Sequence, residues 1–251
     1  MSGHSKWSTI KRKKAANDAK RGAIFTRLAR EIAIAAGEGG GDPEVNFTLR
    51  LAIERAKSEN MPKDNIARAI RRGTGEDKDA AALEQILYEA YGPHGVALLI
   101  EVVTDNRNRT VADLRHTLAD GGGNLADAGS VAWQFQRAGY FYYSTESVDP
   151  DQVFEVAVDA GADDVIVDDE EIEVYAPADR FKAVNDELLA ANLKPEVAEL
   201  RMVPNATLDL PPDQSVKTMR LIERVEDLDD VQNVFSNLSV TEDALDLLEA
   251  A

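Results

Sequence analysis

The spacing of hydrophobic residues changes near residue 80 of this chain. Before that point apolar side chains recur every three or four residues, as in Ile24, Leu28 and Ile32, which is the spacing of one helix face. This first helix is expected to begin near Ile10, and the glycine-rich run at 37–43 should end it. The pattern therefore predicts a long helix with one buried stripe near the start of the chain.

Two shorter helices are predicted to follow the first. Residues 46–60 have helical spacing, and a further helix should begin at Pro62 and end at Gly73, the usual order of proline at the start and glycine at the end. The residues expected to face the core of the three helices are Phe47, Leu51, Ile53, Ala56, Ile66 and Ile70. The first part of the chain is thus predicted to be a small helical bundle.

Strands are predicted beyond residue 84. Residues 85–91 and 96–104 should pair through the Gly-Pro-His-Gly turn between them. Thr110 with Asp113 has the form of a capping box, so a helix is expected to begin there and to end at the glycines 121–123. The later elements expected are a β-hairpin of 131–136 and 140–144 turning near 137–139, a helix at 152–160, strands at 164–168 and 172–175, a helix at 178–192, a strand at 197–203, a helix at 216–225, a strand at 231–235 and a helix from Thr241.

This succession of strand pairs and single helices predicts an α+β protein. We expect an N-terminal three-helix domain followed by two α/β domains of the split βαβ, ferredoxin-like kind. Residues 76–82 and 204–212 lack apolar periodicity and should be exposed connections. The expected domains are a basic helical domain at 1–79, a discontinuous α/β domain at 80–131 plus 205–251, and an inserted α/β domain at 132–204.

Charge is distributed unevenly along the chain. Residues 1–75 hold 16 Lys and Arg against 8 Asp and Glu, a net of +8, whereas residues 76–251 hold 12 against 38, a net of −26. The excess lies within the first thirty residues, where nine basic side chains stand against the single acid Asp18. A basic segment on an acidic protein is typical of phosphate recognition, because neutralised phosphates release condensed counterions. A solvated tail is the alternative.

The candidate nucleic-acid-binding residues follow from this charge pattern. Trp7 could stack on a base or cap the core of the helical bundle. Otherwise nothing in residues 1–21 looks like core. Asn106, Arg107, Asn108 and Arg109 are interpreted as a polar turn before a helix. The candidate contacts are Lys6, Trp7, Lys11, Arg12, Lys13, Lys14, Lys20, Arg21, Arg27, Arg30, Arg68, Arg71 and Arg72.

Several other classes of protein are excluded or disfavoured. The chain has no cysteine, which excludes disulfides and thiolate metal sites. His4, His94 and His116 are scattered, so no metal or other cofactor is expected. No run approaches the roughly 18 apolar residues of a membrane span, and residues 15–23 lack the apolar core of a secretory signal, so a cytoplasmic location is expected. With no paired acid and base, nucleophile or cofactor loop in view, a non-enzyme without a small-molecule substrate is expected.

Long motifs then point to a known family. The chain carries GHSKWSTIKRKKAANDAKRGAIFTRLAREI, GGGDPEVNFTLRLAIERAKSENMPKDNIARAIRRGTG, YEAYGPHGVALLIEVVTDNRNRTVADLRH and GGNLADAGSVAWQF. These motifs resemble the YebC family, densely from residue 3 to about 136 and more loosely thereafter. The resemblance implies an N-terminal helical domain followed by two α/β domains. It also implies a nucleic-acid-binding regulator of gene expression.

The family resemblance leaves two kinds of target open. Some members of the family are described as DNA-binding transcriptional regulators. Others, including the mitochondrial activator of cytochrome oxidase subunit one synthesis, are translational activators that act at the ribosome. DNA-bound control of transcription is the first hypothesis, and binding to ribosomal or messenger RNA, with the ribosome as partner, is the alternative.

Overall fold

The computed structural model describes residue 7, residues 18–77 and residues 80–249. Within residues 18–77, side chains are described from residue 22 onward. The chain forms two compact units. One contains the described residues up to Gln134 together with 206–249, and the other contains residues 135–205. The predicted boundary between a helical and an α/β domain at residue 79 falls inside the first unit and stays a prediction.

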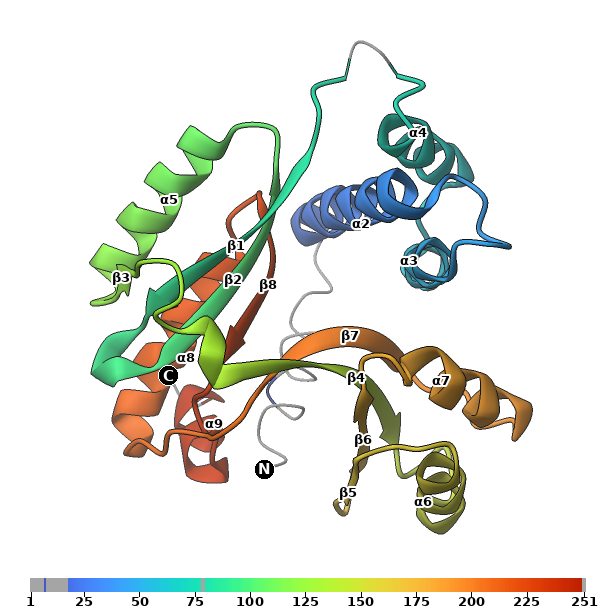
Figure 1. The fold of residues 1–251 in the computed structure, drawn as a ribbon. Helices are drawn as coiled ribbons and strands as arrows, with labels where there is room; N and C mark the ends of the chain where they lie inside the picture. The colour runs from blue at the N-terminus through green and yellow to red at the C-terminus, as the bar shows by residue number, and fades with distance from the viewer. Residues whose placement is uncertain (1–6, 8–17, 78–79, 250–251) are drawn as a thin grey trace. The chain divides into compact units, whose positions relative to one another are not determined.

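From Asp18, where continuous description of the chain begins, the first unit has three helices in succession, as the apolar spacing predicted (Figure 1). They are α2 (Asp18–Gly39), α3 (Phe47–Ser58) and α4 (Lys63–Gly73). Their shared core includes Leu28 and Ile32 of α2, and Leu49 and Ile53 of α3. Phe47 and Leu51 were expected to face this core, but both are half-buried and neither belongs to it, whereas Leu49 is buried. Gly73 fits against α2 so closely that a Cβ atom there would lie 2.1 Å from the carbonyl oxygen of Ala33.

A four-stranded antiparallel sheet forms the rest of the first unit. Its strands are β1 (Glu84–Tyr91), β2 (Ala97–Thr104), β3 (Asn124–Leu125) and β8 (Val231–Ser236), in the order β3-β1-β2-β8. The helices are α5 (Arg107–Asp120), α8 (Pro212–Glu226) and α9 (Glu242–Glu249). Leu98, Ile100 and Val102 of β2 share a buried core with Leu114 of α5 and Met219 of α8. The predicted β1–β2 pairing is confirmed, with a short 3-10 turn at Pro93–Gly95 between the strands.

The second unit has the split βαβ arrangement predicted from sequence. In chain order it contains β4 (Phe135–Ser144), α6 (Pro150–Asp159), β5 (Asp164–Val167), β6 (Glu171–Pro177), α7 (Phe181–Ala190) and β7 (Val197–Pro204). The antiparallel sheet has the order β5-β6-β4-β7, so each helix connects two strands that are not adjacent. The predicted α+β fold class is confirmed.

The predicted hairpin at 131–144 was wrong. Residues 135–144 form one continuous strand, β4, which pairs with both β6 and β7. Gly139, which was interpreted as a turn residue, lies inside this strand against Phe181 of α7. A Cβ atom at position 139 would lie 2.8 Å from Phe181 Cδ2, so the glycine leaves space for the Phe181 ring to pack against β4.

One further local prediction was corrected. The capping box at Thr110 and Asp113 is not formed, because α5 begins earlier and the side chain of Asn106 accepts the N–H of Arg109 at 3.2 Å. The segment 204–212 is mostly exposed, as expected, but it is tethered at Leu208. The N–H of Leu208 donates to the carbonyl of Asn237 at 2.6 Å, and the Leu208 side chain packs against the core. Among the described residues, no helix is both long and apolar enough to cross a membrane.

Candidate nucleic-acid interface

The basic residues nearest the N-terminus fall largely beyond what can be placed. Lys6, Lys11, Arg12, Lys13 and Lys14 lie outside the described residues. Lys20 and Arg21 lie in the first turn of α2, where only the backbone is described. Their assignment as phosphate contacts stays a prediction that rests on their charge and their position in the sequence.

Trp7 lies in the core of the α/β part of the first unit. Its side chain is 3% exposed and shares a buried cluster with Leu98 of β2, Leu118 of α5 and Met219 of α8. The indole Nε1–H donates to the Glu223 carboxylate on α8 at 3.4 Å. The expectation that residues 1–21 contribute nothing to a core is therefore wrong. Trp7 caps the α/β core rather than the core of the helical bundle.

Arg27 and Arg30 of α2 contact the end of α8 and the loop that follows it. The Arg27 guanidinium donates to the carbonyl of Glu226, and that of Arg30 donates to the carbonyl of Asp229. A second nitrogen of Arg30 pairs with the Asp230 carboxylate at 2.9 Å, with the Arg30 side chain 13% exposed. Positions three apart lie on one helix face, so both arginines reach the same segment.

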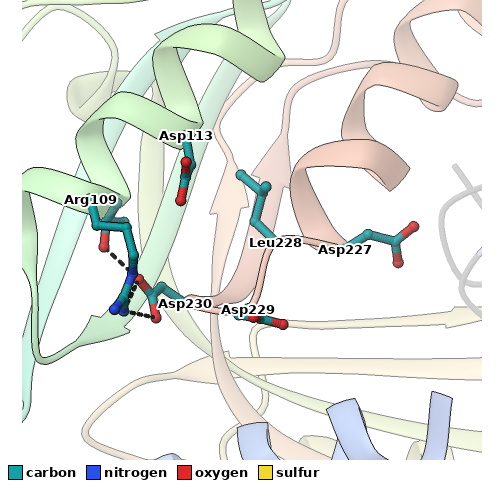
Figure 2. Close-up of a pocket in the computed structure, with 7 residues that line it drawn as sticks. Arg109, Asp113, Asp227, Leu228, Asp229 and Asp230 are labelled. Carbon is teal, nitrogen blue, oxygen red and sulfur yellow. Dashed lines mark hydrogen bonds and ion pairs between the residues drawn. The ribbon is translucent and has the colours of Figure 1, made fainter. Parts of the chain in front are cut away.

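Asp230 is the most heavily bonded carboxylate at this place, as Figure 2 shows in part. Besides Arg30 it accepts hydrogen bonds from Thr110 at 2.6 Å, from Thr104 at 3.0 Å and from Arg109 at 2.9 Å. Burial alone would raise the pKa of Asp230. The hydrogen bonds from Thr110, Arg109 and Thr104 and the charge of Arg30 outweigh burial and lower that pKa below its ordinary value. Asp230 is therefore ionised and joins α2, β2 and α5.

A hollow of about 380 Å³ lies beside this carboxylate (Figure 2). Its lining includes the exposed side chains of Asp113, Asp227 and Asp229. Arg109 also lines the hollow, but its guanidinium is bonded to Asp230. The surplus of negative charge repels phosphate. This hollow is consequently not a candidate for contact with nucleic acid.

The arginines of α4 divide into two kinds. Arg68 and Arg71 are exposed on the bundle surface. Arg72 instead donates to the carbonyl of Ala81 at 3.0 Å and approaches Asp105 to 3.6 Å. The exposed side chains of Arg68 and Arg71 can therefore reach phosphate, whereas Arg72 ties α4 to Ala81, before β1, and to Asp105, after β2.

Glu89 illustrates how another titratable group in this unit is used. Its carboxylate accepts the backbone N–H groups of Gly129, Val131 and Ala132, the last at 2.8 Å. Burial would raise the pKa of Glu89, but these bonds lower it. Glu89 therefore fixes a loop. The described residues contain no group of three or more His, Cys, Asp or Glu placed to hold a metal ion.

The sequence did not reveal that Arg27 and Arg30 join α2 to the end of α8 and to Asp230. Asp230 is one acid in an acid-rich segment, and its partners come from α2, β2 and α5, so nothing local marks it. Arg27 and Arg30 were selected for their charge, which gives no indication that an acceptor from α8 or the following loop lies opposite.

Comparison with known proteins identifies the family. The model of the TACO1/YebC N-terminal domain matches residues 5–76, and that of the TACO1/YebC second and third domains matches residues 83–238. The chain belongs to the TACO1/YebC family. A TACO1/YebC relative from Trichlorobacter lovleyi is 51% identical over 98% of this chain and 99% of its own, and one from Roseiflexus castenholzii is 52% identical over 96% of each. Both are named "Probable transcriptional regulatory protein".

A solved structure has the same fold. The crystal structure of a conserved hypothetical protein from Aquifex aeolicus superposes with a TM-score of 0.83 at 38% identity. The match covers 90% of this chain and 93% of the other. This chain therefore shares its fold with the Aquifex aeolicus protein along most of its length.

Proposed function

We propose that this protein is a DNA-binding regulator of transcription of the YebC type, acting in the cytoplasm. The observation that carries the proposal is the separation of charge, with a net of +8 in residues 1–75 and −26 in the rest. A cationic segment on an otherwise acidic chain is suited to a polyanion, since contacts can form only through that segment. The names of the relatives from Trichlorobacter lovleyi and Roseiflexus castenholzii support transcription as the process.

The phosphate contacts are proposed to come from two regions. The first is the basic segment with Lys6, Lys11, Arg12, Lys13, Lys14, Lys20 and Arg21. The second is the exposed surface of α4 with Arg68 and Arg71. The unit of residues 135–205 holds 17 acids against 5 basic residues, so it should be repelled by DNA and remain available to other partners.

The proposal includes no catalysis, no cofactor and no small-molecule substrate. Two acids with lowered pKa, Glu89 and Asp230, are bonded to backbone N–H groups or to hydroxyl and guanidinium groups of the fold. These bonds hold loops and helices of the fold in place. The titratable groups that stand out therefore support a binding protein rather than an enzyme.

The deciding experiment separates transcription from translation. Chromatin immunoprecipitation of the tagged protein should recover discrete DNA sites. Depletion should then change RNA levels of the adjoining genes, with ribosome occupancy changing only in proportion to RNA. Changed ribosome occupancy at constant RNA level, without recovered DNA sites, would contradict the proposal and favour binding to RNA at the ribosome.

A further inference from the structure

We infer that strand β5 of the second unit binds a positively charged segment of a partner protein, which joins the sheet as an additional strand. β5 (Asp164–Val167) is an edge strand of the sheet β5-β6-β4-β7, and among the strands that the structure describes it pairs only with β6 (Figure 1). Edge strands present main-chain groups to which an extended peptide can pair. This binding site is separate from the proposed phosphate contacts.

The register of β5 shows which main-chain groups point outward. The N–H of Asp168 donates to the carbonyl of Glu171 at 2.9 Å, so these two residues form a hydrogen-bonded pair. In an antiparallel ladder such pairs alternate with pairs that are not hydrogen-bonded to each other. Ile166, two residues before Asp168 in the same register, therefore directs its main-chain groups to β6. Val165 and Val167 direct theirs to the open edge.

The side chains of the same two valines lie on the helix-covered face of the sheet. Val165 is opposite Val174 of β6, and Val174 is opposite Phe141 of β4. The Phe141 ring packs against Phe181 of α7, with 5.1 Å between the ring centroids. Because side chains two residues apart share a face, Val167 lies on this face too. Apolar side chains thus accompany the outward main-chain groups.

Helix α6 adds further apolar surface beside this edge. It packs against both α7 and β5. Val153 and Ala157 are buried under it, and Val156 on one flank is half-buried, as expected for the flank beside α7. Phe154 and Val158 lie one turn apart on the other flank and are 50% and 46% exposed. The exposed pair therefore faces the side of β5.

The direction of the chain places the two apolar groups together. α6 and β5 are joined by the short turn 160–163 and run in opposite directions, so the start of α6 lies beside the end of β5. Phe154 accordingly falls next to Val167, which is itself 49% exposed. A strand added to β5 would pack alternate side chains against both residues. The edge therefore offers apolar contact as well as hydrogen bonds.

Charge selects the kind of strand that fits. Residues 138–179 contain 13 Asp and Glu and no Lys or Arg. A second copy of β5 would bring its own carboxylates against these, which like-charge repulsion disfavours. A strand with Lys or Arg at its ends would instead be attracted. The carboxylates that flank β5 are exposed, and they are Asp163, Asp164, Asp168, Asp169 and Glu170.

The first test is a titration of the full-length, nitrogen-15-labelled protein with a synthetic peptide of alternating valine and threonine, with two lysines at each end. NMR should show shifts of the Val165 and Val167 amide signals, and the exchange of both amide protons should slow. The same peptide with glutamates in place of the lysines should bind at least about tenfold more weakly. Unchanged amide signals at about 1 mM lysine peptide, or equal binding of both peptides, would overturn the inference.

The second test uses variants of the binding edge. Val167→Pro removes an outward N–H without removing a bond to β6, and should weaken binding of the lysine peptide about tenfold. Phe154→Ser, at an exposed position, should weaken it about fivefold. The matched control is Leu247→Ser, which changes a helical apolar residue 42% exposed in the first unit and should leave affinity unchanged.

Thermal melts verify that the variants fold, and Phe154→Ser remains a test of the edge if Val167→Pro does not fold. Wild-type affinity in the folded edge variants would overturn the inference. Shifts of the Val165 and Val167 amides that depend on protein concentration, without peptide, would overturn it as well. They would indicate that a second copy of the chain occupies β5.

Discussion

The contact of Asp230 with Arg30 permits a quantitative prediction of stability. Asp230 is 4% exposed and accepts hydrogen bonds from Thr104, Thr110, Arg109 and Arg30. Replacing it with alanine leaves buried hydroxyls and guanidinium groups without their acceptor. Removing one partner of a buried ion pair typically costs about 3–5 kcal/mol. We expect Asp230→Ala to lower the free energy of unfolding by about 3 kcal/mol, at the lower end because Arg109 is half exposed.

The two arginines should rank below the aspartate. Arg30→Ala leaves Asp230 with three partners, and a hydrogen bond to a charged group contributes about 1.5–3 kcal/mol, so a loss of about 2 kcal/mol is expected. The side chain of Arg109 is 47% exposed, and solvent screens its pair, so Arg109→Ala should cost about 1 kcal/mol or less. Arg115→Ala, at an exposed position of the same helix, is the matched control and should be nearly neutral.

Urea titration followed by tryptophan fluorescence measures these differences. Trp7 and Trp133 both belong to the first unit, so their emission reports the unfolding of the unit that contains Asp230. The expected order of destabilisation is Asp230→Ala, then Arg30→Ala, then Arg109→Ala. The reasoning would be refuted if Asp230→Ala stayed within 1 kcal/mol of wild type, or if Arg109→Ala cost more than Arg30→Ala.

Three further predictions concern acid stability, packing and exposure. The pKa of Asp230 is lower in the folded protein than its ordinary value of 3.8. The stability that the ionised carboxylate contributes is therefore present above that value and is lost as pH falls through the folded pKa. In urea titrations, the difference in the free energy of unfolding between wild type and Asp230→Asn should shrink below about pH 4. Gly139→Ala should destabilise the second unit by about 1–3 kcal/mol because of the contact with Phe181, as read by thermal melts against Ala138→Gly, which adds no atom. Limited proteolysis should cut near residues 76–82 before 204–212, because Leu208 is tied to Asn237; a first cut at 204–212 would contradict this.

Helices and strands could be predicted from the sequence wherever local signals agree with the fold. The three helices of the bundle have strong apolar spacing, with a glycine run before α3 and Pro62 and Gly73 at the ends of α4. Strands β5, β6 and β7 of the second unit likewise have apolar runs bounded by turns. In these cases hydrophobic burial and turn chemistry favour the same structure, so the elements could be predicted without tertiary information.

The failures have non-local causes. A glycine at position 139 is typical of a turn. In the fold it lies in a strand, where a side chain would collide with Phe181, more than forty residues later in the sequence. Trp7 lies in a polar, basic segment, and its core partners Leu98 and Met219 come from distant segments. For the candidate interface, charge alone located the basic residues. Only the folded chain shows that Arg27 and Arg30 contact protein acceptors while Arg68 and Arg71 are exposed.

The central claim, that the basic N-terminal segment provides the phosphate contacts, is tested most directly by the salt dependence of DNA binding. Contact with about six phosphates predicts a slope of log affinity against log salt of about −5 on duplex DNA. Replacing Arg12 and Lys13 with alanine should flatten the slope by about one to two units. Replacing Arg180 and Lys194, also one arginine and one lysine but exposed in the acidic unit, should leave it unchanged. A flatter slope for the second pair and an unchanged slope for the first would contradict the account.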